Sequence, residues 1–199
     1  MEIISDKFRN FLKELRKKSI EMGIPSLPES SARFLSLLTY LYPEKHPKII
    51  ELGAGIGYSV MWMLYGCLSS GKRAKIFAVE KNGDILRESQ RILKKIPEIL
   101  NVDIIEYIEF IKKDSRELEG HEFGENIDIV FMDIEKSEYL SSFLKFKPYM
   151  KKGAILIAHN VISHKEELSD FINEINKKDK YFTLFLETDP KGISVTFLK

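Results

Sequence analysis

The chain has 199 residues, 44% of them hydrophobic, and 31 basic against 30 acidic side chains, for a net charge of +1 at pH 7. This composition predicts one folded domain and excludes a disordered chain or one drawn by its overall charge to nucleic acid or anionic lipid. The single cysteine, Cys67, excludes an internal disulfide, and no apolar run reaches the roughly 18 residues of a membrane helix, so we expect a cytoplasmic protein without a membrane partner.

Residues 1–46 are predicted to form two helices that cover part of the site. The first is amphipathic and ends at Gly23, Pro25 and Pro28, and its apolar residues recur at helical spacing: Ile4, Phe8, Phe11, Leu12 and Leu15. The second begins near Ser30 or Ser31. Its expected apolar side consists of Phe34, Leu35, Leu37, Leu38 and Leu41.

Residues 47–199 alternate between short apolar runs and helical stretches, which is typical of a parallel sheet covered on both faces. The predicted strands read KIIEL, KIFAVE, IDIVFMD and GAILIAH, and another is expected within 107–112. The predicted helices span residues 58–70, 84–95, 137–150 and 165–177. The last two runs, YFTLFLE and GISVTFLK, are joined by a short turn and must pair antiparallel. The prediction is a single α/β domain over 1–199.

The most informative segment lies where the first predicted strand ends. Gly53, Gly55 and Gly57 follow that strand directly and precede a helix, a pattern that lets a ligand approach the backbone at the carboxyl edge of a sheet. A dinucleotide fingerprint would require a further glycine where Tyr58 stands, and no G-K-[ST] sequence of a phosphate-binding Walker loop follows.

Two acidic residues accompany the loop. Glu51 precedes the first glycine by two places, and Glu80 ends the next strand, where a carboxylate can accept both hydroxyl groups of a ribose. Together with the G-x-G-x-G spacing, these residues favour S-adenosylmethionine (SAM) over NAD as the ligand.

The strings IIELGAGIGYSV, FAVEKN, FMDIEKSEYL and GAILIAHNVI resemble the small O-methyltransferases related to catechol and caffeoyl-CoA O-methyltransferase. The resemblance extends from about residue 23 to the C-terminus. The glycine loop is common to the superfamily, whereas D-x-x-K-x-x-Y followed by a strand ending in H-N is more specific to this branch. The resemblance implies a Rossmann-like class I methyltransferase sheet, SAM as cofactor and a divalent metal.

The resemblance also implies roles for individual residues. The pocket for the methionine end of SAM would comprise Glu51, Gly53, Gly55, Gly57, Tyr58 and Ser59. Glu80 would bind the ribose, and Asp114 and Ser115 would lie by the adenine. Asp133 would contact both cofactor and metal, and Lys136 would be the general base.

The candidate metal ligands are Asp133, His159 and Asn160. One of them departs from the family: after this strand the family usually has the pair Asp-Asn, whereas this chain has His159-Asn160. Imidazole suits Mn²⁺ or Co²⁺ better than Mg²⁺, which prefers oxygen ligands. A bound metal is therefore expected to be Mn²⁺ or Co²⁺, while a site that has lost its metal stays an alternative.

The predicted activity is O-methylation of a small-molecule hydroxyl, and homodimers are possible because relatives of this kind often form them. One alternative is methylation of tRNA or another macromolecule, suggested by basic residues of the first helix, although these are also typical of a solvated face: Lys7, Arg9, Lys13, Arg16, Lys17 and Lys18. A second alternative, which His159 permits, is a protein that binds the cofactor without turnover.

Overall fold

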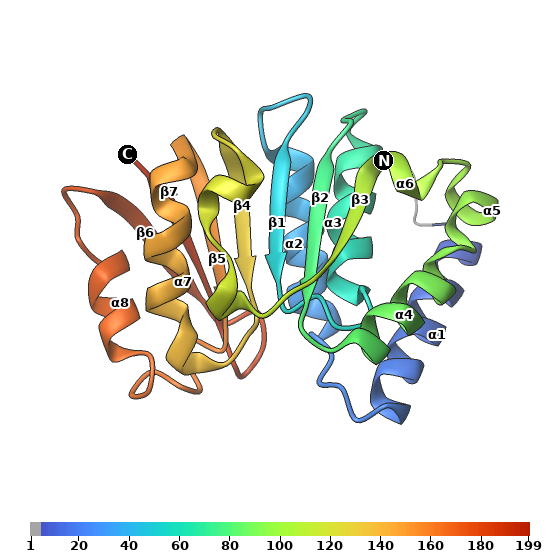
Figure 1. Ribbon diagram of the computed structural model, residues 1–199, viewed down its shortest axis with the longest axis horizontal. Coiled ribbons are helices and arrows are strands. Elements are labelled where there is room, and N and C mark those ends of the chain that lie inside the picture. The colour runs from blue at the N-terminus through green and yellow to red at the C-terminus, as the bar shows by residue number, and fades with distance from the viewer. Residues whose placement is uncertain (1–4) are drawn as a thin grey trace.

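The computed structural model describes residues 5–199, which form a seven-stranded sheet with helices on both faces (Figure 1). The sheet order is β3-β2-β1-β4-β5-β7-β6. The strands are β1 (Lys48–Leu52), β2 (Lys75–Glu80), β3 (Ile108–Lys112), β4 (Ile127–Met132), β5 (Met150–His159), β6 (Tyr181–Leu186) and β7 (Ile193–Leu198). The helices are α1 (Asp6–Glu21), α2 (Glu29–Leu41), α3 (Tyr58–Ser69), α4 (Gly83–Leu93), α5 (Ile96–Leu100), α6 (Ile104–Tyr107), α7 (Tyr139–Phe146) and α8 (Ser169–Ile175).

The first five strands pair in parallel, and β7 pairs antiparallel with both β5 and β6. The predicted fold class and the predicted C-terminal hairpin are therefore confirmed. Part of the first predicted helix, with Ile4, lies outside the described residues.

Successive residues of the central strands face opposite sides of the sheet, so the molecule has two hydrophobic cores. Ile49 of β1 and Phe131 of β4 belong to the core that packs against α1, α2 and α3. Ile50 and Met132, their neighbours in sequence, belong to the core beneath α7 and α8. All four side chains are fully buried, which explains why these strands read as continuous apolar runs.

Helix α2 buries only part of the face predicted from its large apolar residues, since Leu35 is fully buried and Phe34 and Leu38 pack against the core. Leu37 and Leu41 are 50% and 65% exposed, whereas the helix buries Ser31, Ala32, Leu35, Ser36 and Thr39. These small residues let α2 approach α3 closely: a Cβ added at Gly66 would lie 2.2 Å from the Ser36 carbonyl oxygen. The helix also begins after Pro28, earlier than the predicted serine cap.

Two other helix predictions need correction. The segment expected as one helix over 137–150 contains α7 alone as α-helix, because Pro148 ends it in a 3-10 turn and Met150 already begins β5. The helix expected over 165–177 begins only at Ser169. The short helices α5 and α6 were not predicted. Among residues 5–199, no helix is long and apolar enough to cross a membrane.

Candidate active site

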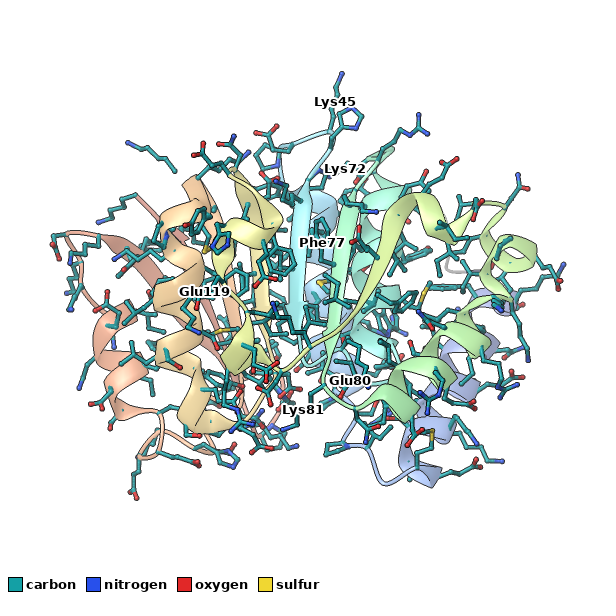
Figure 2. The ribbon with its side chains drawn as sticks, in the orientation of Figure 1. Lys45, Lys72, Phe77, Glu80, Lys81 and Glu119 are labelled. Carbon is teal, nitrogen blue, oxygen red and sulfur yellow. The ribbon has the colours of Figure 1, made fainter. Side chains whose placement is uncertain are left out.

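The predicted site residues gather at the carboxyl edge of the sheet. Figure 2 shows Glu80 and Lys81 at the lower edge, opposite Lys45 and Lys72. The strand order reverses between β1 and β4 at this edge, which is where open α/β sheets bind ligands. A cavity of about 510 Å³ lies there. The predicted residues that line it are Gly53, Gly55, Tyr58, Ser59, Glu80, Ser115, Asp133, Lys136, His159 and Asn160. Glu51, Gly57 and Asp114 do not line it.

The glycine loop packs directly against the end of β4. Gly53 has a φ of +87°, and a Cβ added there would lie 2.3 Å from the Asp133 carbonyl oxygen. Only glycine combines this backbone conformation with such a close approach. The amides of Gly53 and Ala54 both donate to the Val79 carbonyl, at 3.0 and 2.9 Å. The loop therefore runs beneath the cavity with Glu80 directly beside it.

The Glu80 carboxylate is part of the loop structure as well as of the cavity wall. Its Oε2 accepts a hydrogen bond from the Gly55 amide at 3.0 Å, and its Oε1 accepts one from the Asn82 amide at 2.8 Å. Each carboxylate oxygen can accept more than one hydrogen bond. Glu80 is thus held in place and still has lone pairs for a pair of hydroxyl groups.

Glu51 is a fully buried carboxyl beneath the loop. Ser59 Oγ donates a short hydrogen bond to its Oε1, while Oε2 has no hydrogen-bond partner within residues 5–199. Burial raises the pKa of Glu51 to about 8, because the hydrogen bond from Ser59 only partly opposes the desolvation and Asp133 and Glu80 add their negative charges. Near neutral pH this carboxyl is therefore largely protonated and has an unused polar atom.

The raised pKa of Glu51 should make the stability of the folded protein depend on pH. The folded protein keeps the Glu51 proton up to about pH 8, whereas the unfolded chain loses it near 4.5. Between these values the folded state binds more protons, so the free energy of unfolding should fall as pH rises, by up to ~1.4 kcal/mol per pH unit. In Glu51→Gln this fall should disappear, which urea unfolding at about pH 5, 6.5 and 8 would measure.

The matched control is Glu109→Gln, because Glu109 lies on β3 with its side chain 51% exposed. This variant should keep the pH dependence of the wild type. An unchanged pH profile in Glu51→Gln would show that Glu51 is already ionised in the folded protein.

Asp114 and Ser115 follow β3 at the other side of the cavity. Hydrogen bonds from the Arg116 side chain and backbone hold the pKa of Asp114 well below its usual range. Ser115 lines the cavity and donates a short hydrogen bond to Glu138, which lines it too. Sequence reasoning missed Glu138, which is buried although it lies in a polar stretch.

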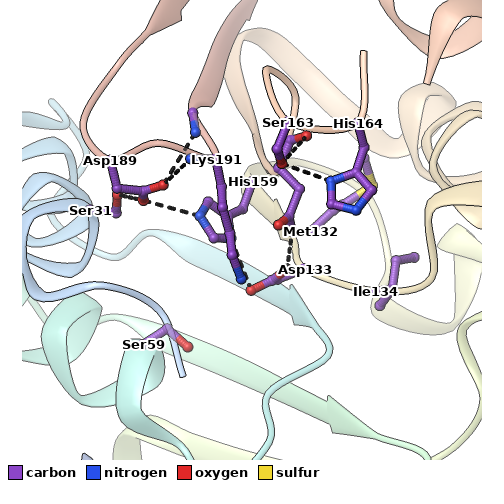
Figure 3. Close-up of polar contacts among 12 residues, drawn as sticks. Ser31, Ser59, Met132, Asp133, Ile134, His159, Ser163, His164, Asp189 and Lys191 are labelled. Atoms are coloured by element: carbon purple, nitrogen blue, oxygen red, sulfur yellow. Dashed lines mark hydrogen bonds and ion pairs between the residues drawn. The ribbon is translucent and has the colours of Figure 1, made fainter. Parts of the chain in front are cut away.

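Asp133 and His159 converge at the ends of the neighbouring strands β4 and β5 (Figure 3), and Asn160 follows His159 directly in the chain. Asn160 Nδ2 donates to Asp133 Oδ1 at 2.7 Å, and His159 Nδ1 lies 3.3 Å from Asp133 Oδ2. Asn160 has a φ of +67°, a left-handed conformation that asparagine adopts more readily than most residues. The three predicted metal ligands are therefore brought into contact with one another.

The structure adds a fourth residue to this group, Asp189 in the β6–β7 turn. Its Oδ2 lies 3.1 Å from His159 Nε2, and Ser31 of α2 donates a short hydrogen bond to the same oxygen (Figure 3). Burial raises the pKa of Asp189, but hydrogen bonds from Ser31, the Lys191 amide and His159 more than offset this, so its pKa lies below the usual value. An ionised Asp189 can accept a hydrogen bond from the N–H at Nε2, while Nδ1 is the ring atom that faces Asp133.

Lys136 lies beside this group on the same edge. Its Nζ donates to the Ile134 carbonyl at 2.9 Å and is 3.9 Å from Asp133 Oδ1. The ammonium also lies over the ring of Tyr139, 5.5 Å from its centroid. With 17% of its side chain exposed, Lys136 is far more enclosed than a typical surface lysine.

The segment between α1 and α2 also lines the cavity, with Ile24, Pro25, Ser26 and Leu27. Sequence reasoning assigned the site no residue from this segment. Its Gly-Ile-Pro composition indicates only a break between helices, and its place over the cavity depends on how α1 and α2 pack on the sheet.

Comparison with known proteins identifies the family. Residues 50–161 match the family model described as a methyltransferase domain. An O-methyltransferase from Bacillus cereus in complex with SAH has a TM-score of 0.79 at 18% identity, over 96% of this chain and 91% of that one.

Two further solved structures are similar. A methyltransferase from Geobacter sulfurreducens has a TM-score of 0.74 at 18% identity, over 100% of this chain and 93% of that one. The O-methyltransferase TomG from Streptomyces achromogenes, in complex with SAM, has a TM-score of 0.75 at 15% identity, over 95% and 89% of the chains. At these identities the likeness shows a shared fold, whereas the family model covers more than half of the chain. The chain therefore belongs to the methyltransferase domain family.

Proposed function

We propose that this protein is a SAM-dependent O-methyltransferase that methylates a hydroxyl group of a small molecule. The observation that carries the proposal is the juxtaposition of the glycine loop, Glu80 and Lys136 around one cavity at the carboxyl edge of the sheet. The match to a methyltransferase domain and the likeness to O-methyltransferase folds support it.

The residues around the loop fit SAM. Glu80 has free lone pairs for the two ribose hydroxyls, and the close approach at Gly53 keeps the loop backbone free of side chains. Glu51 and its neighbours Tyr58 and Ser59 lie on the side proposed for the methionine end. Asp114 and Ser115 are proposed for the adenine side. SAM supplies a methyl group on a sulfonium and leaves as an uncharged thioether.

The donor set at β4 and β5 fits a divalent metal of the nitrogen-tolerant kind. Asp133 offers a carboxylate oxygen, His159 offers Nδ1 and Asn160 offers its amide oxygen. In residues 5–199 no three His, Cys, Asp or Glu side chains form a metal site, so the amide is needed as the third ligand. The contact from His159 Nε2 to Asp189 matches the pattern of histidine ligands, which donate their other N–H to a carboxylate. Mn²⁺ or Co²⁺ would lower the pKa of the acceptor hydroxyl there.

Lys136 is the proposed general base. A hydroxyl acceptor must lose its proton as the new O–C bond forms, and an enclosed Nζ beside Asp133 is placed to receive it once it is uncharged.

A small acceptor is favoured over tRNA because residues 24–27 and His164 line the same cavity as the proposed SAM site. The volume of about 510 Å³ lies within the usual range of small-molecule pockets. Salt-dependent binding of tRNA, with no small acceptor turned over, would favour the macromolecular alternative.

Self-association as a homodimer is also proposed. Phe182, Leu184 and Phe185 on the outermost strand β6 are 54%, 41% and 40% exposed, and an exposed apolar edge strand is a common surface for pairing. Sedimentation velocity would detect the dimer, and a monomer at every concentration would rule it out.

The cofactor proposal predicts the effect of Glu80→Ala. Loss of two hydrogen bonds to a charged group should weaken SAM binding by about 1.5–3 kcal/mol, or roughly 10- to 150-fold, in titration calorimetry. Glu135→Ala is the matched control, because Glu135 lines the same cavity with its side chain 69% exposed and should leave affinity unchanged. Unchanged affinity in Glu80→Ala, or tighter binding of NADH than of SAM, would overturn the cofactor assignment.

A further inference from the structure

A second cavity, of about 530 Å³, lies between α1, α2 and α3. It is distinct from the active-site cavity, with which it shares only Tyr58. Five cationic side chains line it: Arg9, Lys13, Arg16, Lys17 and Arg33. Four of the basic residues of the first helix, Arg9, Lys13, Arg16 and Lys17, thus border this hollow.

The charges of this second cavity are only partly compensated. Two carboxylates line it, with Arg33 Nη2 at 2.7 Å from Glu29 and Lys17 Nζ at 3.9 Å from Glu21. Lys13 and Arg16 have no carboxylate within 4.0 Å in the part of the chain that the structure describes. The excess of positive charge favours an anion.

Two buried N–H groups at this cavity also have no hydrogen-bond partner among residues 5–199, namely Trp62 Nε1 and Arg16 Nε. The Trp62 side chain is only 3% exposed, yet it lines the cavity. A buried donor without an acceptor costs about 1–3 kcal/mol, and such groups in a native structure call for an explanation. An acceptor atom from a ligand that reaches such a group would satisfy it.

The inner surface of the cavity is apolar and aromatic. Leu12, Tyr58 and Trp62 are all more than nine-tenths buried. The Arg33 guanidinium lies 5.6 Å from the centroid of the Trp62 ring. Such a surface favours an aromatic body, and the cations around it favour a negatively charged substituent.

We infer that the cavity between α1, α2 and α3 binds a small aromatic anion, an aryl phosphate or an aromatic carboxylate, with its charge toward Arg16 and Lys13 and its ring against Trp62. The inference rests on the second cavity alone and does not depend on the proposed methyl transfer.

The protein contains its own reporter for this site, because Trp62 is its single tryptophan. The probe is phenyl phosphate, titrated into the full chain with saturating SAH so that the active-site cavity is occupied. We expect a saturable change in Trp62 emission with a Kd below about 1 mM. Phenol and inorganic phosphate should each bind at least about tenfold more weakly. Added salt should weaken the binding of phenyl phosphate.

Arg16→Met should weaken the binding of phenyl phosphate about tenfold, as expected when a hydrogen bond to a charged group is lost. If Arg16→Met fails to fold, Lys13→Met tests the role of positive charge in the same cavity, because Lys13 lines it at an exposed position. Arg87→Met is the matched control, because Arg87 lies on α4 with its side chain 71% exposed and does not line the cavity.

Three results would overturn the inference. The first is the absence of a saturable change up to 10 mM phenyl phosphate. The second is equal binding of phenol and phenyl phosphate, which would remove the role of the cations. The third is a Trp62 emission that changes on dilution of the protein but not with anions, which would make this face a contact between copies of the chain.

Discussion

Replacing Lys136 by methionine should lower kcat by roughly 10²–10⁴-fold, the range for a lost general base, while SAM affinity changes little. The reason is geometric: Nζ lies 3.9 Å from Asp133 Oδ1 and only 17% of the side chain is exposed. Methionine keeps the length and apolar contacts of lysine and removes only the group that can accept a proton. The measurement is release of SAH with a phenol or catechol that the wild type methylates.

Lys81→Met is the matched control for this experiment. Lys81 lines the same cavity, but its side chain is 53% exposed and pairs with Glu135 at 3.8 Å. It should retain nearly full turnover. If Lys136→Met also turns over at the wild-type rate, Lys136 has no role in proton transfer.

Exchanging histidine for aspartate at position 159 should shift the preference of the metal site from Mn²⁺ or Co²⁺ toward Mg²⁺. A site with one carboxylate, one imidazole and one amide suits nitrogen-tolerant ions, whereas a second carboxylate adds the charged oxygen that Mg²⁺ prefers. The structure refines the experiment, because Asp189 Oδ2 lies 3.1 Å from His159 Nε2. His159→Asp alone would bring two carboxylates together, so the informative variant is His159→Asp combined with Asp189→Asn.

Binding of Mn²⁺ and its displacement by Mg²⁺, followed by the electron paramagnetic resonance of free Mn²⁺, measures this preference without any turnover. Asp189→Asn alone should weaken Mn²⁺ binding about 10- to 100-fold, as expected when the partner that orients a histidine ligand is lost. Glu187→Gln, two residues away in the same turn, should leave Mn²⁺ affinity unchanged. If the wild type binds no Mn²⁺ and is fully active in EDTA, the metal site is ruled out and Asp133 contacts only the cofactor.

Much of the fold could be predicted from the sequence because the signals are local. Apolar runs of strand length alternate with helical stretches, and the strands β1, β2 and β4 lie where these runs stand. Glycines at three alternate positions after β1 predicted a ligand loop, and Gly53 and Gly57 have φ values of +87° and +89°. These features depend on side-chain period and backbone freedom, which each segment carries by itself.

Only part of the buried face of α2 could be predicted in this way, with Leu35 the predicted residue that is fully buried. Its large apolar residues Leu37 and Leu41 are exposed, because Gly66 of α3 admits Ser36 and Thr39 at close range instead. Which face of a helix is buried depends on the shape of its neighbour, and the decisive residue here, Gly66, lies 25 residues beyond the end of α2.

The environment of His159 also depends on the tertiary structure. The sequence alone determined that Asp133 and His159 end neighbouring strands and so lie at one edge of the sheet. Asp189 and Ser31 are 158 residues apart and belong to a polar turn and a helix start that carry no sign of a site. The packing of α2 and of the β6–β7 turn over the end of β5 brings Asp189 and Ser31 to the Nε2 side of the His159 ring. A contact between such distant segments depends on how the elements pack, so it leaves no local pattern in the sequence.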